Sequence, residues 1–243
     1  MKNKTLHFVT KRPMQKISQK TRKNHTKKIQ GKIISEKEGW KVLKIYGTPF
    51  EMGYAHGYLL AQDLKDVYET FLFVIKTDLK IPFSQYLEKS NSLIKPIVIS
   101  RYPDIYEELK GISEGARSKG THISVDFLIS WNSYMSLYSI FKSESVENKN
   151  NDKQRCSAFI ATGSATENGD IVMAHNTHST FIEGKFMNIV MYLNPDKGIP
   201  FMMQTSPGFI SSISDWFICE SGIIGCETTI AYTNYKPSFG NPA

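Results

Sequence analysis

The chain has 243 residues, of which 40% are hydrophobic and 12% aromatic, so it is long enough to bury a core and is not disordered throughout. Its net charge of +7 comes from residues 1–32, which hold eleven Lys or Arg and no Asp or Glu, whereas the remainder holds 19 basic and 23 acidic residues. The positive charge is therefore a property of one end of the chain, and it does not indicate a basic, nucleic-acid-binding fold.

Residues 1–32 have few apolar side chains and repeat Lys, Asn, Gln and Thr, which predicts a disordered basic tail. An adaptor that binds anionic membranes or nucleic acid through this tail is one hypothesis. We expect no specific nucleic-acid binding, because no aromatic ladder or binding motif accompanies the basic residues. The sequence also shows no recognisable secretory signal and no apolar run long enough for a transmembrane segment, so a soluble protein is the default expectation.

The three cysteines, Cys156, Cys219 and Cys226, are too few for a disulfide framework, and none has a Cys or His at zinc-finger spacing. We expect reduced thiols, with Cys219 and Cys226 structural. No metal or cofactor is predicted.

Residues 33–155 are predicted to be mainly helical after a short strand at 42–46. Thr48, Pro49 and Glu51 form the start signal of a helix that we expect to run to about Lys76. On this helix Gly53 and Gly57 would let another backbone approach closely, and His56 is interpreted as a packed or surface histidine.

Two more helices are predicted in this segment. One begins at Asp104 as its N-cap and ends at Gly120, and the next begins at Ser124. Their apolar positions follow helical spacing and are predicted to lie in the core: Ile105, Leu109, Ile112, Ala116, Leu128, Trp131, Met135 and Tyr138. The polar run at 143–155 predicts an exposed loop open to cleavage.

From Cys156 the pattern changes to the period of two that is typical of strands. Pairs of strands are predicted around Asn168–Gly169, around residues 194–198, and around Ser221–Gly222. The chain is therefore predicted to be α+β, with residues 156–243 forming an antiparallel sheet built from hairpins.

Cys156 stands at the start of the first of these strands, and His175 lies on the next one. A tight turn at Asn168–Gly169 would place His175 opposite Thr162, about 20 Å from Cys156. A longer loop would place His175 directly opposite Cys156. Both registers put the two side chains on one face of the hairpin. We predict the second, which allows contact.

Three blocks of the chain combine the helix start, the cysteine hairpin and the last hairpin. They are residues 47–57 (GTPFEMGYAHG), residues 156–163 with 173–178 (CSAFIATG and MAHNTH), and residues 214–217 with 221–230 (SDWF and SGIIGCETTI). In this order they resemble the isopenicillin N acyltransferase family of autoproteolytic cysteine acyltransferases and its relatives, the phospholipase B-like proteins. The resemblance implies the αββα sandwich of N-terminal nucleophile hydrolases.

The resemblance also implies a chemistry. The Cys156 thiol would attack the carbonyl of Arg155, the chain would open between these residues, and the released α-amine would serve as the base for the thiol. A free α-amino group titrates near pH 7.7 to 8.0 and a free thiol near about 8.5, so proton transfer between two such groups costs little. For the oxyanion the resemblance suggests His175, Thr228 or Thr229, and less strongly Asn176, whose side chain points to the opposite face.

The chain departs from the family pattern in two places. His178 stands where Trp is common, and its role is left open, with an exposed or structural histidine preferred. Residues 156–243 contain no Arg, and the later strands of the family have no counterpart before Ala243. The sandwich is therefore expected to be incomplete at its C-terminal end, and a second chain could complete the sheet.

The function that we expect is an autoproteolytic, phospholipase B-like cysteine hydrolase or acyltransferase that acts on amide or ester bonds of acylated small molecules or lipids. The alternative is a non-catalytic remnant or subunit of such an enzyme, and the basic-tail adaptor ranks third.

Overall fold

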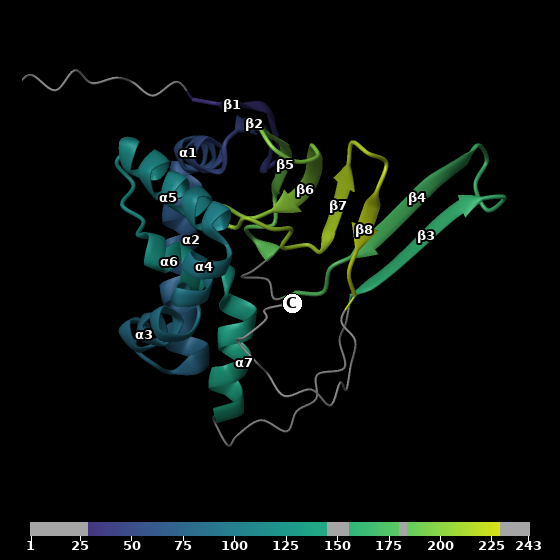
Figure 1. Ribbon diagram of the computed structural model, residues 1–243. Helices are drawn as coiled ribbons and strands as arrows, with labels where there is room; N and C mark the ends of the chain where they lie inside the picture. Colours follow the sequence, from purple (N-terminus) through teal and green to yellow (C-terminus); the bar gives the residue numbers. More distant parts are fainter. Residues whose placement is uncertain (1–28, 145–155, 180–183, 229–243) are drawn as a thin grey trace, which may run out of the picture.

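The computed structural model describes residues 29–144, 156–179 and 184–228. Within these ranges the chain is a mixed α+β protein, in which helices pack on one side of a six-stranded mixed sheet and a separate two-stranded hairpin extends away from the body (Figure 1). The predicted basic tail, residues 1–32, lies almost wholly outside the described residues.

The strands of the sheet, in spatial order, are β1 (Gly31–Lys37), β2 (Trp40–Gly47), β5 (Ile189–Pro195), β6 (Phe201–Thr205), β7 (Trp216–Cys219) and β8 (Ile224–Cys226). The hairpin consists of β3 (Ser157–Gly163) and β4 (Gly169–Asn176). The helices are α1 (Pro49–Leu59), α2 (Ala61–Val74), the π-helix η1 (Ile75–Leu79), α3 (Phe83–Leu93), α4 (Lys95–Arg101), α5 (Pro103–Ser118), α6 (Val125–Asn132) and α7 (Tyr134–Glu144).

The strand pairs described within the segment 156–243 are all antiparallel, as predicted, but they belong to two sheets, and the six-stranded sheet as a whole is mixed. β5 pairs with β2 in parallel, from Lys41 opposite Ile189 to Gly47 opposite Pro195. The period of two in the sequence shows which face of a strand is buried but not which strand lies beside it. The sheet therefore joins strands from both predicted segments, 33–155 and 156–243. The segment boundaries themselves remain a prediction.

The start of α1 is the predicted capping box. The Thr48 hydroxyl accepts a hydrogen bond from the Glu51 amide at 3.3 Å, and the Glu51 carboxylate accepts one from the Thr48 amide at 2.9 Å. The predicted continuation to Lys76 is interrupted at Leu60, whose backbone leaves the helical region between α1 and α2. Leu60 is fully buried, so the break turns the chain without exposing an apolar side chain, and the sequence pattern does not reveal it.

The backbones of α1 and α5 are in direct contact where the two helices cross. A Cβ atom on any of four glycines would lie 2.0 to 2.2 Å from a carbonyl oxygen of the opposite helix; these are Gly53, Gly57, Gly111 and Gly115. Such a separation is far below van der Waals contact, so only glycine fits. The close approach predicted for Gly53 and Gly57 is confirmed.

His56 is a structural residue at this crossing, in agreement with the packed histidine of the sequence analysis. It is 1% exposed, and its Nε2 accepts a hydrogen bond of 2.8 Å from the Gly208 amide. Burial disfavours the charged ring and lowers the pKa of His56 to about 3. The ring is therefore neutral and ties α1 to the segment after β6.

The caps and the buried residues of helices α5 to α7 agree only in part with the sequence predictions. Ser124 caps α6 as predicted, accepting a hydrogen bond from the Phe127 amide at 3.1 Å. Asp104 is not the cap of α5, because that helix begins at Pro103, whose fixed φ suits the first helical position. Met135 is 73% exposed, which contradicts its predicted place in the core, since the break between α6 and α7 rotates it outward. Ile105, in the first turn of α5, is 37% exposed and also lies outside the core.

The strand β1, which begins at Gly31, and the helices α3 and α4 were not predicted.

The core has two clusters. One cluster lies among the helices around Phe71, Tyr86, Phe127 and Trp131, and a second lies between α1 and the inner face of β2, β5 and β6.

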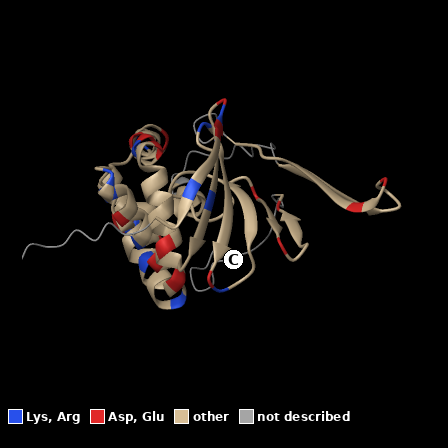
Figure 2. Cartoon of the chain, turned by 90° about the horizontal axis from the view of Figure 1, so that it is seen from above, with Lys and Arg blue, Asp and Glu red and all other residues tan. Residues whose placement is uncertain are grey.

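The outer face of the sheet has no helical layer in the described part of the chain. Trp40, Tyr46 and Tyr192 are between 39% and 46% exposed there. No described helix is both long enough and apolar enough to cross a lipid bilayer. Figure 2 shows that the charged residues lie mainly on the helices. The hairpin, residues 157–176, has Glu167 and Asp170 near its turn as its charged residues of the Asp, Glu, Lys and Arg types.

Candidate functional site

Cys156 immediately precedes β3 and is half-buried at the base of the hairpin, where β4 also ends. The hairpin is closed by a loop between Gly163 and Gly169, not by a two-residue turn. The predicted exposed loop at 143–155, with Arg155 of the predicted cleavage bond, lies outside the described residues except for the end of α7.

The hairpin register differs from both registers considered from the sequence. His175 pairs with Ala158 and Asn176 with Ser157, so the predicted direct pairing of His175 with Cys156 is wrong by one side-chain position on that face. Ala158 follows Cys156 by two residues and shares its face, so His175 is a diagonal neighbour of Cys156. Long side chains can reach a diagonal neighbour, so His175 and Cys156 lie close together although the register differs from the predicted one.

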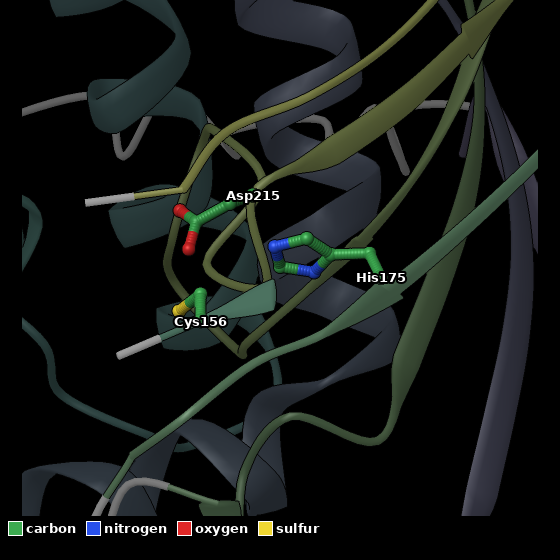
Figure 3. A group of neighbouring side chains, drawn as sticks. All are labelled: Cys156, His175 and Asp215. Atoms are coloured by element: carbon green, nitrogen blue, oxygen red, sulfur yellow. The ribbon is translucent and has the colours of Figure 1, made fainter. Parts of the chain in front are cut away.

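Three side chains converge at this place. The sulfur of Cys156, a ring nitrogen of His175 and a carboxylate oxygen of Asp215 all lie within 4.8 Å of one another (Figure 3). Each of the three residues is half-buried. The hairpin supplies the first two, and the segment just before β7 supplies Asp215. We call these residues the Cys–His–Asp cluster.

The ring of His175 is held by oxygen atoms on two sides. Its Nε2 lies 2.7 Å from the backbone carbonyl oxygen of Glu227, and its Nδ1 lies 3.3 Å from the hydroxyl of Thr177. The Thr177 hydroxyl donates its own proton to the carbonyl of Ser214 at 3.0 Å. The imidazole is thus fixed in orientation by the segments that flank β7 and β8.

The sulfur of Cys156 accepts a hydrogen bond of 3.3 Å from the backbone amide of His178. Such a donor interacts more strongly with a thiolate than with a thiol, because the thiolate carries a full negative charge. The side chain of His178 is exposed, as predicted, so this residue contributes to the cluster through its backbone.

Asp215 has a left-handed backbone with φ of 63°, and its carbonyl accepts a hydrogen bond of 2.8 Å from the Glu227 amide. Asp tolerates this region better than most residues do, at a cost of order 1 kcal/mol. Burial raises the pKa of Asp215 and the charge of Glu227 raises it further, whereas His175 acts in the opposite direction. The backbone is held in a conformation that directs this carboxylate toward Cys156 and His175 (Figure 3).

The other predicted site residues fare differently. Asn176 faces away from Cys156, as the sequence analysis noted, and its amide donates to Ser157 at 3.4 Å. Thr228 is exposed and lies one residue beyond Glu227. Thr229 is outside the described residues. Cys219 and Cys226 are free thiols in β7 and β8.

Asp215 was missed as a site residue, although the block SDWF at 214–217 contains it. Nothing in its spacing relates it to Cys156, 59 residues earlier in the printed sequence. Only its presence within one of the three blocks could have drawn attention to it.

The fold and the cluster define a mixed α+β protein with a cysteine, a histidine and an aspartate gathered at the start of a strand. Residues 42–237 match the model of the phospholipase B family, and the chain belongs to that family.

A search of curated proteins finds a similar uncharacterized protein of Archaeoglobus fulgidus, 24% identical over 196 residues. The alignment covers 74% of this chain and 32% of the archaeal protein. The chain thus matches about a third of that relative's length.

Proposed function

We propose that this chain carries the nucleophile of a phospholipase B-type acyl hydrolase that acts on ester or amide bonds of acylated lipids or small molecules. One observation supports this above all. The thiol of Cys156 stands at a strand start with His175 and Asp215 within 4.8 Å of one another and of the sulfur. A nucleophile requires such neighbours to accept its proton and to stabilise its charge.

The first step is self-cleavage before Cys156. The sulfur attacks the carbonyl carbon of Arg155, the peptide bond to the Cys156 nitrogen breaks, and a thioester and a free α-amine result. Water then hydrolyses the thioester and releases the carboxylate of Arg155. Before cleavage the nitrogen of Cys156 is an amide and cannot act as a base, so His175 or Asp215 takes the proton of the thiol.

After cleavage the α-amine of Cys156 becomes the nearest base. Attack on a substrate carbonyl forms an acyl thioester and expels the alcohol or amine, and water or an acceptor amine then takes the acyl group. The tetrahedral intermediate needs hydrogen-bond donors for its oxyanion. The amide of His178 already points at the sulfur, and it joins Thr228, Thr229 and His175 as a candidate donor.

A complete αββα sandwich requires a second sheet and a second helical layer. The exposed aromatic side chains on the outer face of the sheet, at Trp40, Tyr46 and Tyr192, support this architecture, since such a face is normally covered. Further polypeptide, in this protein or in a second chain, would cover it.

Measuring the intact mass of the purified full chain tests the proposal. We expect wild type to yield fragments divided between Arg155 and Cys156, and Cys156→Ala to remain whole. Cys219→Ala is the matched control and should cleave like wild type. Release of fatty acid from phospholipid micelles by the cleaved chain, and its absence in Cys156→Ala, tests the activity.

An uncut wild type whose mass behaviour equals that of Cys156→Ala would reject self-cleavage and favour the alternative, a non-catalytic remnant or subunit. If wild type cleaves, the cleavage rates of Asp215→Asn and His175→Gln separate the two bases. The residue whose substitution slows cleavage more is the proton acceptor in the uncut chain.

A further inference from the structure

The Cys–His–Asp cluster combines a thiol, an imidazole and a carboxylate, which is a common ligand set for zinc. In a tetrahedral site, Zn–S of about 2.3 Å and Zn–N or Zn–O of about 2.0 to 2.2 Å place the ligand atoms roughly 3.4 to 3.6 Å apart. The three ligand atoms here are already within 4.8 Å of one another. Side-chain rotations that move them inward by about 1 Å would satisfy the geometry.

The histidine has the support that metal-bound imidazoles require. A ligating imidazole normally donates its second N–H to a carbonyl, carboxylate or hydroxyl, which fixes the ring. On His175, Nε2 faces the Glu227 carbonyl at 2.7 Å and Nδ1 faces the Thr177 hydroxyl at 3.3 Å. Whichever nitrogen binds a metal, the other therefore keeps an oxygen partner.

The charges favour a divalent cation. Bound to a metal as a thiolate, a carboxylate and a neutral imidazole, the three side chains would carry two negative charges, which a cation of charge +2 would neutralise. With one thiolate, one imidazole and one carboxylate, the cluster suits Zn²⁺ rather than Mg²⁺ or Ca²⁺, which prefer several oxygen ligands.

We propose that Cys156, His175 and Asp215 bind one Zn²⁺ ion per chain, with the fourth position open to water. Binding displaces the thiol proton to solvent and engages the sulfur electron pair. A consequence that rests on the proposed function is that Zn²⁺ restrains the nucleophile, since the bound sulfur cannot attack Arg155 or a substrate. Metal binding itself does not depend on that function.

Titration of the full chain with Co²⁺, a spectroscopic substitute for Zn²⁺, tests the proposal. A thiolate ligand gives a charge-transfer band in the near-ultraviolet. We expect this band to saturate at one Co²⁺ per chain and to disappear on addition of one equivalent of Zn²⁺. Cys156→Ser should abolish it, and Asp215→Asn should keep the band while weakening Co²⁺ binding by about tenfold or more.

The controls are matched in chemistry. The double variant Cys219→Ser with Cys226→Ser removes the other two thiols and should leave the band unchanged. Glu220→Gln removes a carboxylate at the turn between β7 and β8, at the other end of these strands from Asp215, and should not alter the affinity. Circular dichroism of every variant checks that the fold is retained.

Three results would overturn the proposal: a band that persists in Cys156→Ser, a band that is lost in the double cysteine variant, or equal Co²⁺ affinity for Asp215→Asn and wild type. The intact mass tests the proposed function separately, because it shows whether the chain cleaves before Cys156. If the chain binds Co²⁺ at Cys156 but never cleaves, the metal site is supported and the proposed function is rejected. If the chain cleaves but does not bind Co²⁺, the proposed function is supported and the metal site is rejected. Slower cleavage with Zn²⁺, restored by a chelator, would link the two.

Discussion

The α1–α5 crossing is tightly packed, whereas the β3–β4 hairpin is largely exposed to solvent. At the crossing, the backbones of two helices touch through four glycines, and His56 is buried beside them. In the hairpin, apolar side chains point outward on both faces, with Phe159 59% and Ile171 52% exposed. The Cys–His–Asp cluster lies where the base of the hairpin meets the body, so its geometry depends on how firmly that junction is held.

The helix crossing should be the part most sensitive to one added methyl group. In Gly57→Ala the new Cβ would lie 2.0 Å from the carbonyl oxygen of Ile112, and neither backbone can move without separating the helices. We expect a loss of about 3 kcal/mol or more in the free energy of unfolding, measured by urea denaturation.

Gly184→Ala is the matched control, because among the described residues no atom beyond its neighbours in the sequence lies within 4 Å of the added Cβ. It should change stability by less than about 0.5 kcal/mol. Equal effects of the two substitutions would show that the crossing is looser than described.

The pH dependence of stability should reveal two opposing groups at this crossing. The neutral, buried His56 has a pKa lowered to about 3, so its contribution is present above pH 6.5 and decreases as the pH falls toward 3. Burial raises the pKa of Glu108 to about 7, so its contribution is present below pH 4.5 and decreases as the pH rises through 7. Between these limits the two partly cancel.

Glu108→Gln should expose the His56 effect. Of the two groups only His56 titrates in this variant, and we expect the free energy of unfolding to fall by about 2 kcal/mol as the pH decreases from 7 to 5. In His56→Gln only Glu108 titrates, so over the same range the free energy of unfolding should rise by about 2 kcal/mol. Denaturation curves at a series of pH values measure it. Parallel pH profiles for the two variants would contradict the assignment.

The hairpin should give the smallest response. Phe159→Ala removes a side chain that is mostly exposed, and we expect a change in stability within about 0.5 kcal/mol. Phe71→Ala, at a ring that is 3% exposed in the helical core, should cost about 3 to 5 kcal/mol in the same thermal or chemical denaturation experiment. A cost above 1 kcal/mol for Phe159→Ala would mean that the hairpin packs against another surface in solution.

Local signals in the sequence predicted local features well. Thr48 and Glu51 gave the start of α1, Ser124 gave that of α6, and the turn residues gave the hairpins from β5 onward. Met135 and the break at Leu60 were missed, because an apolar pattern continues across a bend without a change in period. The parallel pairing of β2 with β5 was missed because strand neighbours are chosen by packing between distant segments.

The candidate site shows the same division. The sequence by itself indicated that Cys156 stands at the start of a strand and that His175 shares its face. Both registers considered from the sequence differ from the observed one by an even number of residues, and only an odd shift would move His175 to the other face. Only the tertiary structure decided that His175 is a diagonal neighbour and that Asp215 completes the cluster. The length of the hairpin loop sets the position of His175 relative to Cys156, and the return of the chain before β7 brings Asp215 to the cluster. Spacing along the sequence encodes neither of these.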